Sequence, residues 1–459
     1  MSWGTLKALR RRRAKASGSL YGDSESAPRP VNSNPSIENF TILLGLFCLG
    51  LLVRIFFNYL YKPMPWPDAL TYIRSGASLW RSGRIDSDLV MPLYPAVIGF
   101  IGPTAVLWLQ IVLSAGFAML AYALALDISG SIAAARVAGL IMALDPVTAF
   151  YTTQRLTETL YTVLLAAAVL TWYRARYAWG MLLFVLSLMV RPTIDLLGPF
   201  LVLAFLWVNE RRLTARRAFG QLALYAVIYV AVMAPWWWHN YQKYGTFVRL
   251  NLGDGIVCRV EQNEVFDVAG IDWKRLEPIM TEFRDVADPV QRNQNYRDAA
   301  LRYVQENPGK YVVFSIRRFF RFWSPVMDQS DEFLHSRKLR AVSLMATLPV
   351  LVGFVLALAA STRRLLMRML PVLLVIAYLT AVHVATHALV RYRVPLTPLV
   401  AAISAMFWSW LIVWGRRQRQ PAVVAEISSH ADRAFSPGAS KEASGEPRES
   451  PVRKCQDTE

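Results

Sequence analysis

The chain has 459 residues, of which 54% are apolar and only 18% are charged, and its formal net charge is +18. Ordinary globular chains are about 45–50% apolar and about 25% charged. This composition excludes a disordered chain and argues against a soluble enzyme. The positive charge, which would suggest nucleic acid in a soluble protein, is better explained by basic loops beside a membrane, so we expect no nucleic-acid partner. The three cysteines are too far apart to suggest a disulfide framework.

Long apolar runs predict an all-α protein, a polytopic membrane helix bundle of about ten spans. A bilayer core of about 30 Å requires about 20 apolar residues per helix. The predicted spans are Thr41–Leu60, Ala105–Leu126, Ala134–Phe150, Thr157–Tyr173, Ala178–Val190, Thr193–Val208, Phe219–Trp237, Leu339–Ala360, Leu366–His387 and Val394–Trp414. The fifth and sixth are short and could form one broken element.

The charge of the loops predicts the orientation. The short loops on the side of the two termini hold ten arginines, whereas those on the other side hold four. Because basic loops stay in the cytoplasm, we expect a protein of the cytoplasmic (inner) membrane with both termini in the cytoplasm. The active site is then expected on the periplasmic or exterior face. Residues 1–39 and 416–459 are polar and are expected to be disordered cytoplasmic tails, with no cleavable signal peptide before the first span.

Two outer segments interrupt the spans. The first outer loop, 61–104, lies within the spanning region 40–237, and a second outer segment, 238–338, precedes the last spans, 339–415. A connection of about 100 residues usually has structure or function of its own. We therefore expect the chemistry on the outer face.

The second outer segment indicates shape more than chemistry. Asp298–Gln305 predicts a helix that ends at Asn307-Pro308-Gly309. Tyr311–Trp323 predicts an amphipathic helix that lies in the membrane interface and binds anionic lipid. The turn-rich stretch 251–255 is a candidate lining of an acceptor site.

Carboxylates mark the first outer loop. Asp68 opens an amphipathic stretch, where it could cap a helix or act as a general base at the edge of a cavity. Asp86-Ser87-Asp88 follows. Two acidic residues at this spacing can bind a divalent cation through their oxygens, but the same pattern occurs in plain turns.

Polar residues near the predicted span ends each have two interpretations. His383 and His387 are spaced to bind a metal if a carboxylate approaches, which Asp68, Asp86, Asp88 or Glu158 could supply, or they are ordinary interfacial histidines. Glu158 is a second active-site acid or a carboxylate favoured by a helix N-terminus. His239 follows three tryptophans and could bond a lipid headgroup. Arg54 lies inside a span, where a cation costs about 2.5–3.5 kcal/mol, so it must face a cavity or a partner.

Several short motifs occur in a fixed order along the chain. They are Asp68, Pro92-Leu93-Tyr94-Pro95, Thr157-Glu158, Arg191-Pro192, Ala234-Pro235-Trp236 with His239-Asn240-Tyr241, Asn307-Pro308, Phe322-Trp323-Ser324-Pro325 and Arg391-Tyr392-Arg393-Val394-Pro395. In this order and placement, over about residues 40–415, the chain resembles the C-type (GT-C) glycosyltransferases. The nearest group is the bacterial branch of the dolichyl-phosphate-mannose protein mannosyltransferase and aminoarabinose transferase superfamily, which is glycosyltransferase family 39-like.

The resemblance implies a bundle of membrane helices with a catalytic first outer loop, and a sugar donor carried on a polyprenyl phosphate. Asp68 stands where such enzymes keep their catalytic acid, and Asp88 lies near a second acidic position. A polyprenyl phosphate leaves as an anion and needs positive charge, whereas the acceptor hydroxyl needs a base.

Arginines supply the expected positive charge. Arg391 and Arg393, which flank Tyr392, and Arg191 are the predicted ligands of the donor phosphate, because a guanidinium donates two hydrogen bonds at once. The alternative is that these arginines anchor helix ends at the interface. Arg54 is a further candidate.

We therefore predict an integral membrane glycosyltransferase, a hexosyl- or pentosyltransferase. It moves one sugar from a polyprenyl-phosphate donor to a lipid, glycan or protein acceptor outside the membrane. A divalent metal is the one cofactor that the acidic pair and the histidines could hold. The alternatives are a transporter or flippase of lipid-linked sugars and a non-catalytic membrane assembly protein.

Overall fold

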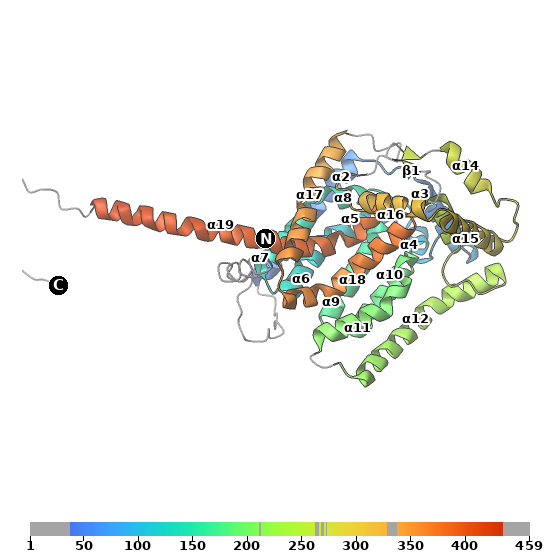
Figure 1. Ribbon diagram of the computed structural model, residues 1–459, viewed down its shortest axis with the longest axis horizontal. Helices are drawn as coiled ribbons and strands as arrows, with labels where there is room; N and C mark the ends of the chain where they lie inside the picture. Colours follow the sequence, from blue (N-terminus) through green and yellow to red (C-terminus); the bar gives the residue numbers. More distant parts are fainter. Residues whose placement is uncertain are drawn as a thin grey trace, which may run out of the picture. The chain divides into compact units, whose positions relative to one another are not determined.

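The computed structural model describes residues 37–210, 213–261, 266–267, 270–271, 273–327 and 337–434. The chain divides into two units, residues 1–410 and 411–459. Figure 1 shows the ribbon, in which the regular elements of the described residues are helices apart from one antiparallel pair of two-residue strands. Of the predicted tails, residues 416–434 continue the last helix, and residues 1–36 and 435–459 lie outside the described part of the chain.

In chain order the elements are α2 (Ile37–Leu60), α3 (Pro67–Ser82), α4 (Leu93–Ile101), α5 (Ala105–Ala115), α6 (Phe117–Ser129), α7 (Ile132–Leu144), α8 (Pro146–Thr152), α9 (Glu158–Tyr173), α10 (Tyr177–Leu188), η1 (Pro192–Leu197), α11 (Gly198–Asn209), α12 (Ala215–Tyr244), α13 (Asp254–Glu261), β1 (Phe266–Asp267), β2 (Gly270–Ile271), α14 (Trp273–Thr281), α15 (Pro289–Glu306), α16 (Pro308–Phe322), α17 (Arg337–Ala360), α18 (Arg363–Ala385), η2 (Val390–Leu396) and α19 (Thr397–Ala434). The elements η1 and η2 are 3₁₀ helices. The two helices expected in the second outer segment are present as α15, which is longer than predicted, and α16.

Seven helical stretches in the described residues are long and apolar enough to cross a membrane, and an eighth is included if a bent pair counts as one span. They are Asn39–Leu60, Ala105–Ser129, Pro192–Asn209, Ala215–Tyr244, Arg337–Ala360, Arg363–Ala385 and Val390–Gly415. The bent pair is α7 with α8, at 47°. The predicted multi-pass helical membrane protein is therefore confirmed, but the count of ten spans was too high.

Two of the predicted spans are too short. Helices α9 and α10 have 16 and 12 residues, or about 24 and 18 Å at 1.5 Å per residue, against a hydrocarbon core of about 30 Å. A turn at Ala175, whose φ is 54°, separates them. Most of their apolar residues are at least partly buried, and Trp172 at the end of α9 is fully buried, although Trp179 of α10 is exposed. An apolar run in the sequence is therefore typical of a helix buried among other helices as well as of a helix that crosses the lipid.

The bend between α7 and α8 also has a local cause. Asp145 caps α8 by accepting a hydrogen bond from the Thr148 backbone N–H, and Pro146 occupies the first helical position. Proline has no N–H to continue the ladder of α7. The predicted span Ala134–Phe150 is therefore two helices.

Arg54 lies in α2 and is fully buried. Its guanidinium donates hydrogen bonds to the carbonyls of Met142 (2.8 Å) and Ala143 (2.5 Å) and to the Thr148 hydroxyl (3.1 Å). Those carbonyls belong to the C-terminal turn of α7, where a helix has unpaired acceptors and favours a cation. The expectation that Arg54 faces a partner holds, and the partner is a helix end.

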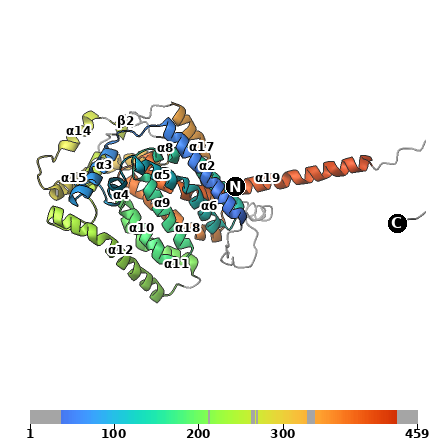
Figure 2. The ribbon, with the colours of Figure 1, turned by 180° about the vertical axis from the view of Figure 1, so that it is seen from behind.

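The two outer segments share one end of the first unit. Helices α3 and α4 of the first outer loop gather there with α14 and α15 of the second outer segment in both views (Figures 1 and 2). Helices α3 and α4 pack closely because Gly76 of α3 faces Gly99 of α4. The Trp80 indole N–H also donates to the Ala96 carbonyl at 2.9 Å. This pair of helices fixes the position of Asp68, in the first turn of α3.

Candidate functional site

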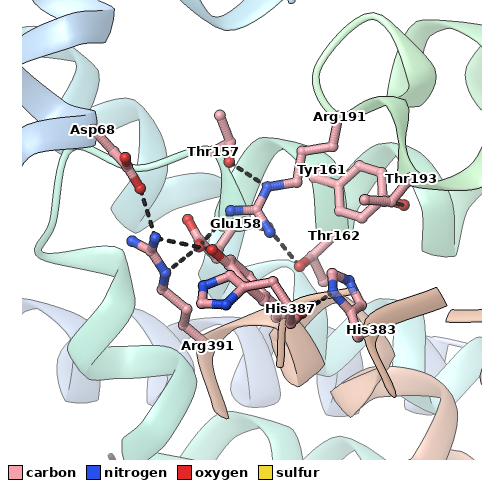
Figure 3. A network of polar contacts seen from close by, with 11 residues as sticks. Asp68, Thr157, Glu158, Tyr161, Thr162, Arg191, Thr193, His383, His387 and Arg391 are labelled. Carbon is pink, nitrogen blue, oxygen red and sulfur yellow. Dashed lines mark hydrogen bonds and ion pairs between the residues drawn. The ribbon is translucent and has the colours of Figure 1, made fainter. Parts of the chain in front are cut away.

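Asp68 does not cap its helix. Trp66 is the N-cap of α3, no side chain caps the helix, and Pro67 holds the first position. The Asp68 carboxylate instead accepts a 2.6 Å hydrogen bond from Arg391 Nη2, and 44% of its side-chain surface stays exposed. Figure 3 shows this contact at the edge of a polar network. The capping interpretation is wrong, and the carboxylate is open to an incoming group.

Arg391, in η2, is the centre of the network. Its side chain is 10% exposed. The guanidinium lies 5.5 Å from the ring centroid of Trp66 and 5.0 Å from that of Tyr392, whose hydroxyl accepts from Nη2. Its Nε and Nη1 are buried without a hydrogen-bond partner, although Nε lies 4.0 Å from Glu158 Oε1. Two donor nitrogens of this cation are therefore available to an anion.

Arg191, just before η1, approaches the same point from another part of the chain. Its Nη2 donates to Glu158 Oε1 at 2.8 Å and its Nε to the Thr157 hydroxyl at 2.7 Å. The guanidinium lies 4.9 Å from the Tyr392 ring centroid. Two arginines and two carboxylates, Asp68 and Glu158, therefore meet around one tyrosine.

The electrostatics favour the charged state of these groups. Burial opposes ionisation of Asp68, but Arg391, Arg191 and His387 together outweigh it, so the pKa of the Asp68 carboxyl lies below its ordinary value. Burial likewise opposes the charge of Arg191, and the Glu158 carboxylate outweighs it, so the pKa of this guanidinium is raised. Asp68 is ionised at neutral pH and able to accept a proton.

The two predicted metal-binding histidines have other contacts. His383 Nδ1 lies 2.9 Å from the His387 carbonyl oxygen, and its ring stacks on Tyr392 and Phe322 at centroid distances of 4.9 and 5.5 Å. The His387 ring meets the Tyr392 ring edge-on. In the part of the chain that the structure describes, no group of three or more His, Cys, Asp or Glu side chains could hold a metal ion. The four predicted ligands, Asp86, Asp88, His383 and His387, therefore do not form one centre.

Arg393 lies outside the network. Its Nη1 donates to the carbonyls of Phe322 (3.2 Å) and Ser324 (2.8 Å), at the C-terminal end of α16. Its side chain is buried. Arg393 and Arg391 are two residues apart, yet the 3₁₀ turn directs one to a helix end and the other to Asp68.

Asp88 and His239 belong to a different region. The Asp88 carboxylate accepts from the Tyr244 hydroxyl and pairs with Lys243, both at 2.8 Å. His239 Nε2 accepts from the Ile85 backbone N–H at 3.1 Å, and its ring stacks on Trp236. The described contacts of Asp88 are thus with α12 and the second outer segment rather than with the group around Asp68.

A cavity of about 350 Å³ lies beside Asp88. It is lined by residues 86–89 of the first outer loop and by residues of the second outer segment, which include Arg292, Asn293 and Tyr296. The two outer segments therefore meet, as a shared outer face requires.

Two members of the network were not predicted as site residues. Trp66, which supports the Arg391 guanidinium, stands in the loop before α3, where no periodicity singles it out. Thr157, which bonds Arg191, could be noticed only as part of the Thr157-Glu158 motif. Both act through contacts between distant segments.

The chain is similar to known proteins in structure but not in sequence. No protein family and no curated protein matches the sequence. The structure is similar to two structures of the oligosaccharyltransferase of Archaeoglobus fulgidus, one without ligand and one, named AglB, in complex with an inhibitory peptide and a dolichol-phosphate. Sequence identities are 9% and 11%, both TM-scores are 0.48, and the matches cover 84% and 88% of this chain. The chain spans about half, 52%, of those proteins.

A third match is ArnT from Cupriavidus metallidurans bound to undecaprenyl phosphate, with 12% identity and a TM-score of 0.40. It covers 88% of this chain and 82% of ArnT. The matches are of the kind that the sequence motifs resemble, C-type membrane glycosyltransferases. At these identities and TM-scores they assign neither a family nor an activity to this chain.

Proposed function

We propose that the protein is an integral membrane glycosyltransferase that moves one sugar from a polyprenyl-phosphate donor to an acceptor on the outer face of the membrane. The observation that carries this proposal is a cluster around Tyr392, in which Arg391 pairs with the open carboxylate of Asp68 and Arg191 pairs with the buried carboxylate of Glu158. The arginine side chains are 13% and 10% exposed. Neither cation is therefore a freely solvated surface charge.

The two guanidinium groups suit a phosphate. Arg391 has buried N–H donors without a partner, and a planar guanidinium matches phosphate oxygens with two parallel hydrogen bonds. The rings of Trp66 and Tyr392 flank its charge. A phosphate at the head of a lipid would supply oxygen acceptors for these buried donors, which are costly to leave without a hydrogen-bond partner.

The reaction is then a displacement at the anomeric carbon. The acceptor hydroxyl gives its proton to Asp68 while its oxygen bonds to the sugar carbon. The bond from that carbon to the phosphate oxygen breaks, and its electron pair stays on the polyprenyl phosphate. Negative charge thus leaves Asp68 and arrives on the phosphate, where the arginines stabilise it.

The two alternative functions explain fewer features of these residues. A transporter of lipid-linked sugars needs the arginines, but it needs no ionised carboxylate that touches one of them and stays open. A non-catalytic assembly protein needs neither the open carboxylate nor the unpaired donors of Arg391. The sugar and the acceptor (lipid, glycan or protein) are to be identified by experiment.

Mass spectrometry of envelope glycans tests the proposal. A deletion strain should lack one sugar substituent, which returns with the wild-type gene and does not return with Asp68→Asn. Asp285→Asn, which alters an exposed carboxylate of the second outer segment, should restore the substituent fully. An unchanged glycan profile in the deletion strain, or full restoration by Asp68→Asn, would contradict the proposed function.

A further inference from the structure

Glu158 is the most deeply buried charged member of the network. It is the first residue of α9 and its side chain is 0% exposed. Oε1 accepts from Arg191 at 2.8 Å and lies 4.0 Å from Arg391 Nε. Oε2 is buried and has no hydrogen-bond partner among the described residues. A fully buried carboxylate thus has an acceptor to spare (Figure 3).

The same Glu158 carboxylate lies close to donors without a partner. Arg391 Nε and Nη1 are also buried without a hydrogen-bond partner. The separation of 4.0 Å between Nε and Glu158 Oε1 is about 1 Å longer than a normal hydrogen bond. Unmade hydrogen bonds of buried charged groups are costly. The arrangement therefore favours a second state in which Arg391 has moved toward Glu158.

We propose that Glu158 is a positioning residue, which receives Arg391 when this guanidinium leaves Asp68 to bind the donor phosphate. The inference rests on the proposed function. In the free protein, Arg391 contacts Asp68 through Nη2. With the donor present, Nη1 and Nη2 face the phosphate while Nε bonds Glu158, which also keeps Arg191 in place. Asp68 is then released as a base only when there is a sugar to transfer.

The charges of the network support this exchange. Asp68 and Glu158 balance Arg191 and Arg391, so the free site is neutral. A donor phosphodiester adds one negative charge, which competes with Asp68 for Arg391. The groups that face Asp68 are Arg391, Arg191 and His387, with Tyr72 on its own helix. Because Arg391 contributes most to lowering the pKa of Asp68, its departure makes Asp68 a stronger base.

A purely structural role for Glu158 predicts something different. A carboxylate in the first turn of a helix stabilises the helix through its dipole, and its loss would lower the amount of folded protein without separating donor binding from turnover. A positioning role does separate them. Neutral Gln at 158 leaves the two arginines with excess positive charge, so they hold Asp68 and any phosphate at least as tightly as before. The rate falls because Asp68 stays paired.

The test uses the purified full chain in nanodiscs, with Glu158→Gln, Glu158→Asp and a matched control, Asp195→Asn. Asp195 is also a buried carboxylate at the start of a helix, and its partners, Tyr229 and Arg249, are not members of this network. Affinity for undecaprenyl phosphate and the transfer rate at saturating donor are measured for the folded fraction of each variant. The polyprenyl-phosphate-linked sugar is the one identified from the deletion strain.

For Glu158→Gln we expect kcat to fall about ten- to 150-fold, which corresponds to the free energy of one charge-assisted hydrogen bond. The Kd for undecaprenyl phosphate should stay equal or decrease. Glu158→Asp should recover part of kcat, and Asp195→Asn should change neither quantity. A normal kcat in Glu158→Gln, or equal losses in Glu158→Gln and Asp195→Asn, would overturn the inference alone. A wild type that neither binds undecaprenyl phosphate nor transfers the sugar would overturn the proposed function itself.

Discussion

At the scale of single residues, the site depends on which way each charged side chain is turned. Arg391 and Arg393 are chemically identical and nearly adjacent, but one meets a carboxylate and the other meets two carbonyls. A guanidinium paired with an ionised carboxylate can exchange that partner for a phosphate. One that satisfies helix-end carbonyls would leave buried acceptors unpaired if it moved.

Asp68→Asn should lower the transfer rate about 10²–10⁴-fold, the usual effect of losing a general base. The amount of inserted protein should not change, because Asp68 makes no capping bond that Asn would have to replace. The measurement is sugar transfer by equal amounts of purified protein, with Asp285→Asn as the matched control. Turnover of Asp68→Asn near that of the wild type would remove Asp68 from the reaction.

Arg391→Lys should fall between the wild type and Arg391→Gln in its use of donor. Lys keeps the charge but loses the two-pronged geometry, and Gln loses both. The apparent KM for the donor should rise about ten- to 150-fold in Arg391→Gln, since one charge-assisted hydrogen bond contributes about 1.5–3 kcal/mol. The KM for the acceptor should not change. Equal kinetics of Lys and Arg would instead indicate that the side chain only anchors a helix end.

The lowered pKa of Asp68 predicts the pH dependence. A base must be ionised, so activity is lost as the pH falls through its pKa. For kcat/KM, which reports the free protein, this limb should lie below about pH 3.9, the ordinary value for Asp. For kcat, which reports the donor complex, the limb should lie at higher pH, because Arg391 has left Asp68. Coincident limbs in the two profiles would argue against that exchange.

How far the sequence predicts the site can be judged residue by residue. Asp68, Glu158, Arg191, Arg391 and Tyr392 were predicted as site residues, and the structure brings them together. Their short motifs could not show that Asp68 pairs with Arg391, because 323 residues separate the two. Nor could the motifs distinguish Arg391 from Arg393, because the direction in which each side chain of a 3₁₀ turn points depends on tertiary packing.

At the scale of elements, two pairs of helices fix the site. Helix α3 is held against α4 where Gly76 meets Gly99, with no room for a side chain. Helix α2 is held to α7 by the buried guanidinium of Arg54. The first contact positions Asp68, and the second stabilises the bundle that carries Glu158.

Gly76→Ala should separate α3 from α4. A Cβ at this position would lie 2.6 Å from the Pro95 carbonyl oxygen, so backbone must move. Overpacking of this kind costs about 1–3 kcal/mol, and it displaces Asp68 from Arg391. Thermal unfolding in detergent and transfer rate should both fall, whereas Arg74→Ala on the exposed side of α3 should leave both unchanged. Wild-type stability in Gly76→Ala would show that the two helices are not tightly held.

The elements also show what hydrophobic patterns can predict. The long spans were recognised from apolar runs of 16 to 22 residues. Helices α9 and α10 were recognised as apolar but were misread as spans, because their burial comes from other helices. The break at Pro146 was visible in the sequence, but its consequence depends on the cap at Asp145.

At the scale of the whole molecule, the proposed topology places the site at the outer surface and both termini in the cytoplasm. The loop arginines support this orientation, and an even number of spans is needed for it. The eight candidate spans of the described residues, counted with the bent pair as one span, satisfy that condition. Arg191 and Arg391 lie at the starts of the candidate spans 192–209 and 390–415, where the proposed topology places a lipid headgroup.

Cysteine labelling in intact cells tests the topology. In a background without the three native cysteines, a cysteine at Asp285 should react with a membrane-impermeant maleimide, and one at Ser17 or Ser444 should react only after the cells are broken. The reason is that basic loops are retained inside. Labelling of either tail in unbroken cells would reverse the orientation and move the site to the cytoplasmic face.

Binding of undecaprenyl phosphate to the purified protein in nanodiscs tests the central claim most directly. Each of the two variants, Arg391→Gln and Arg393→Gln, removes one buried arginine from the wild type. The comparison between them therefore separates loss of the phosphate site from general destabilisation. If the group around Arg391 and Arg191 holds the donor phosphate, Arg391→Gln should weaken binding about ten- to 150-fold, and Arg393→Gln should bind like the wild type. Equal affinity of all three proteins, or a larger loss in Arg393→Gln, would contradict the assignment of this site.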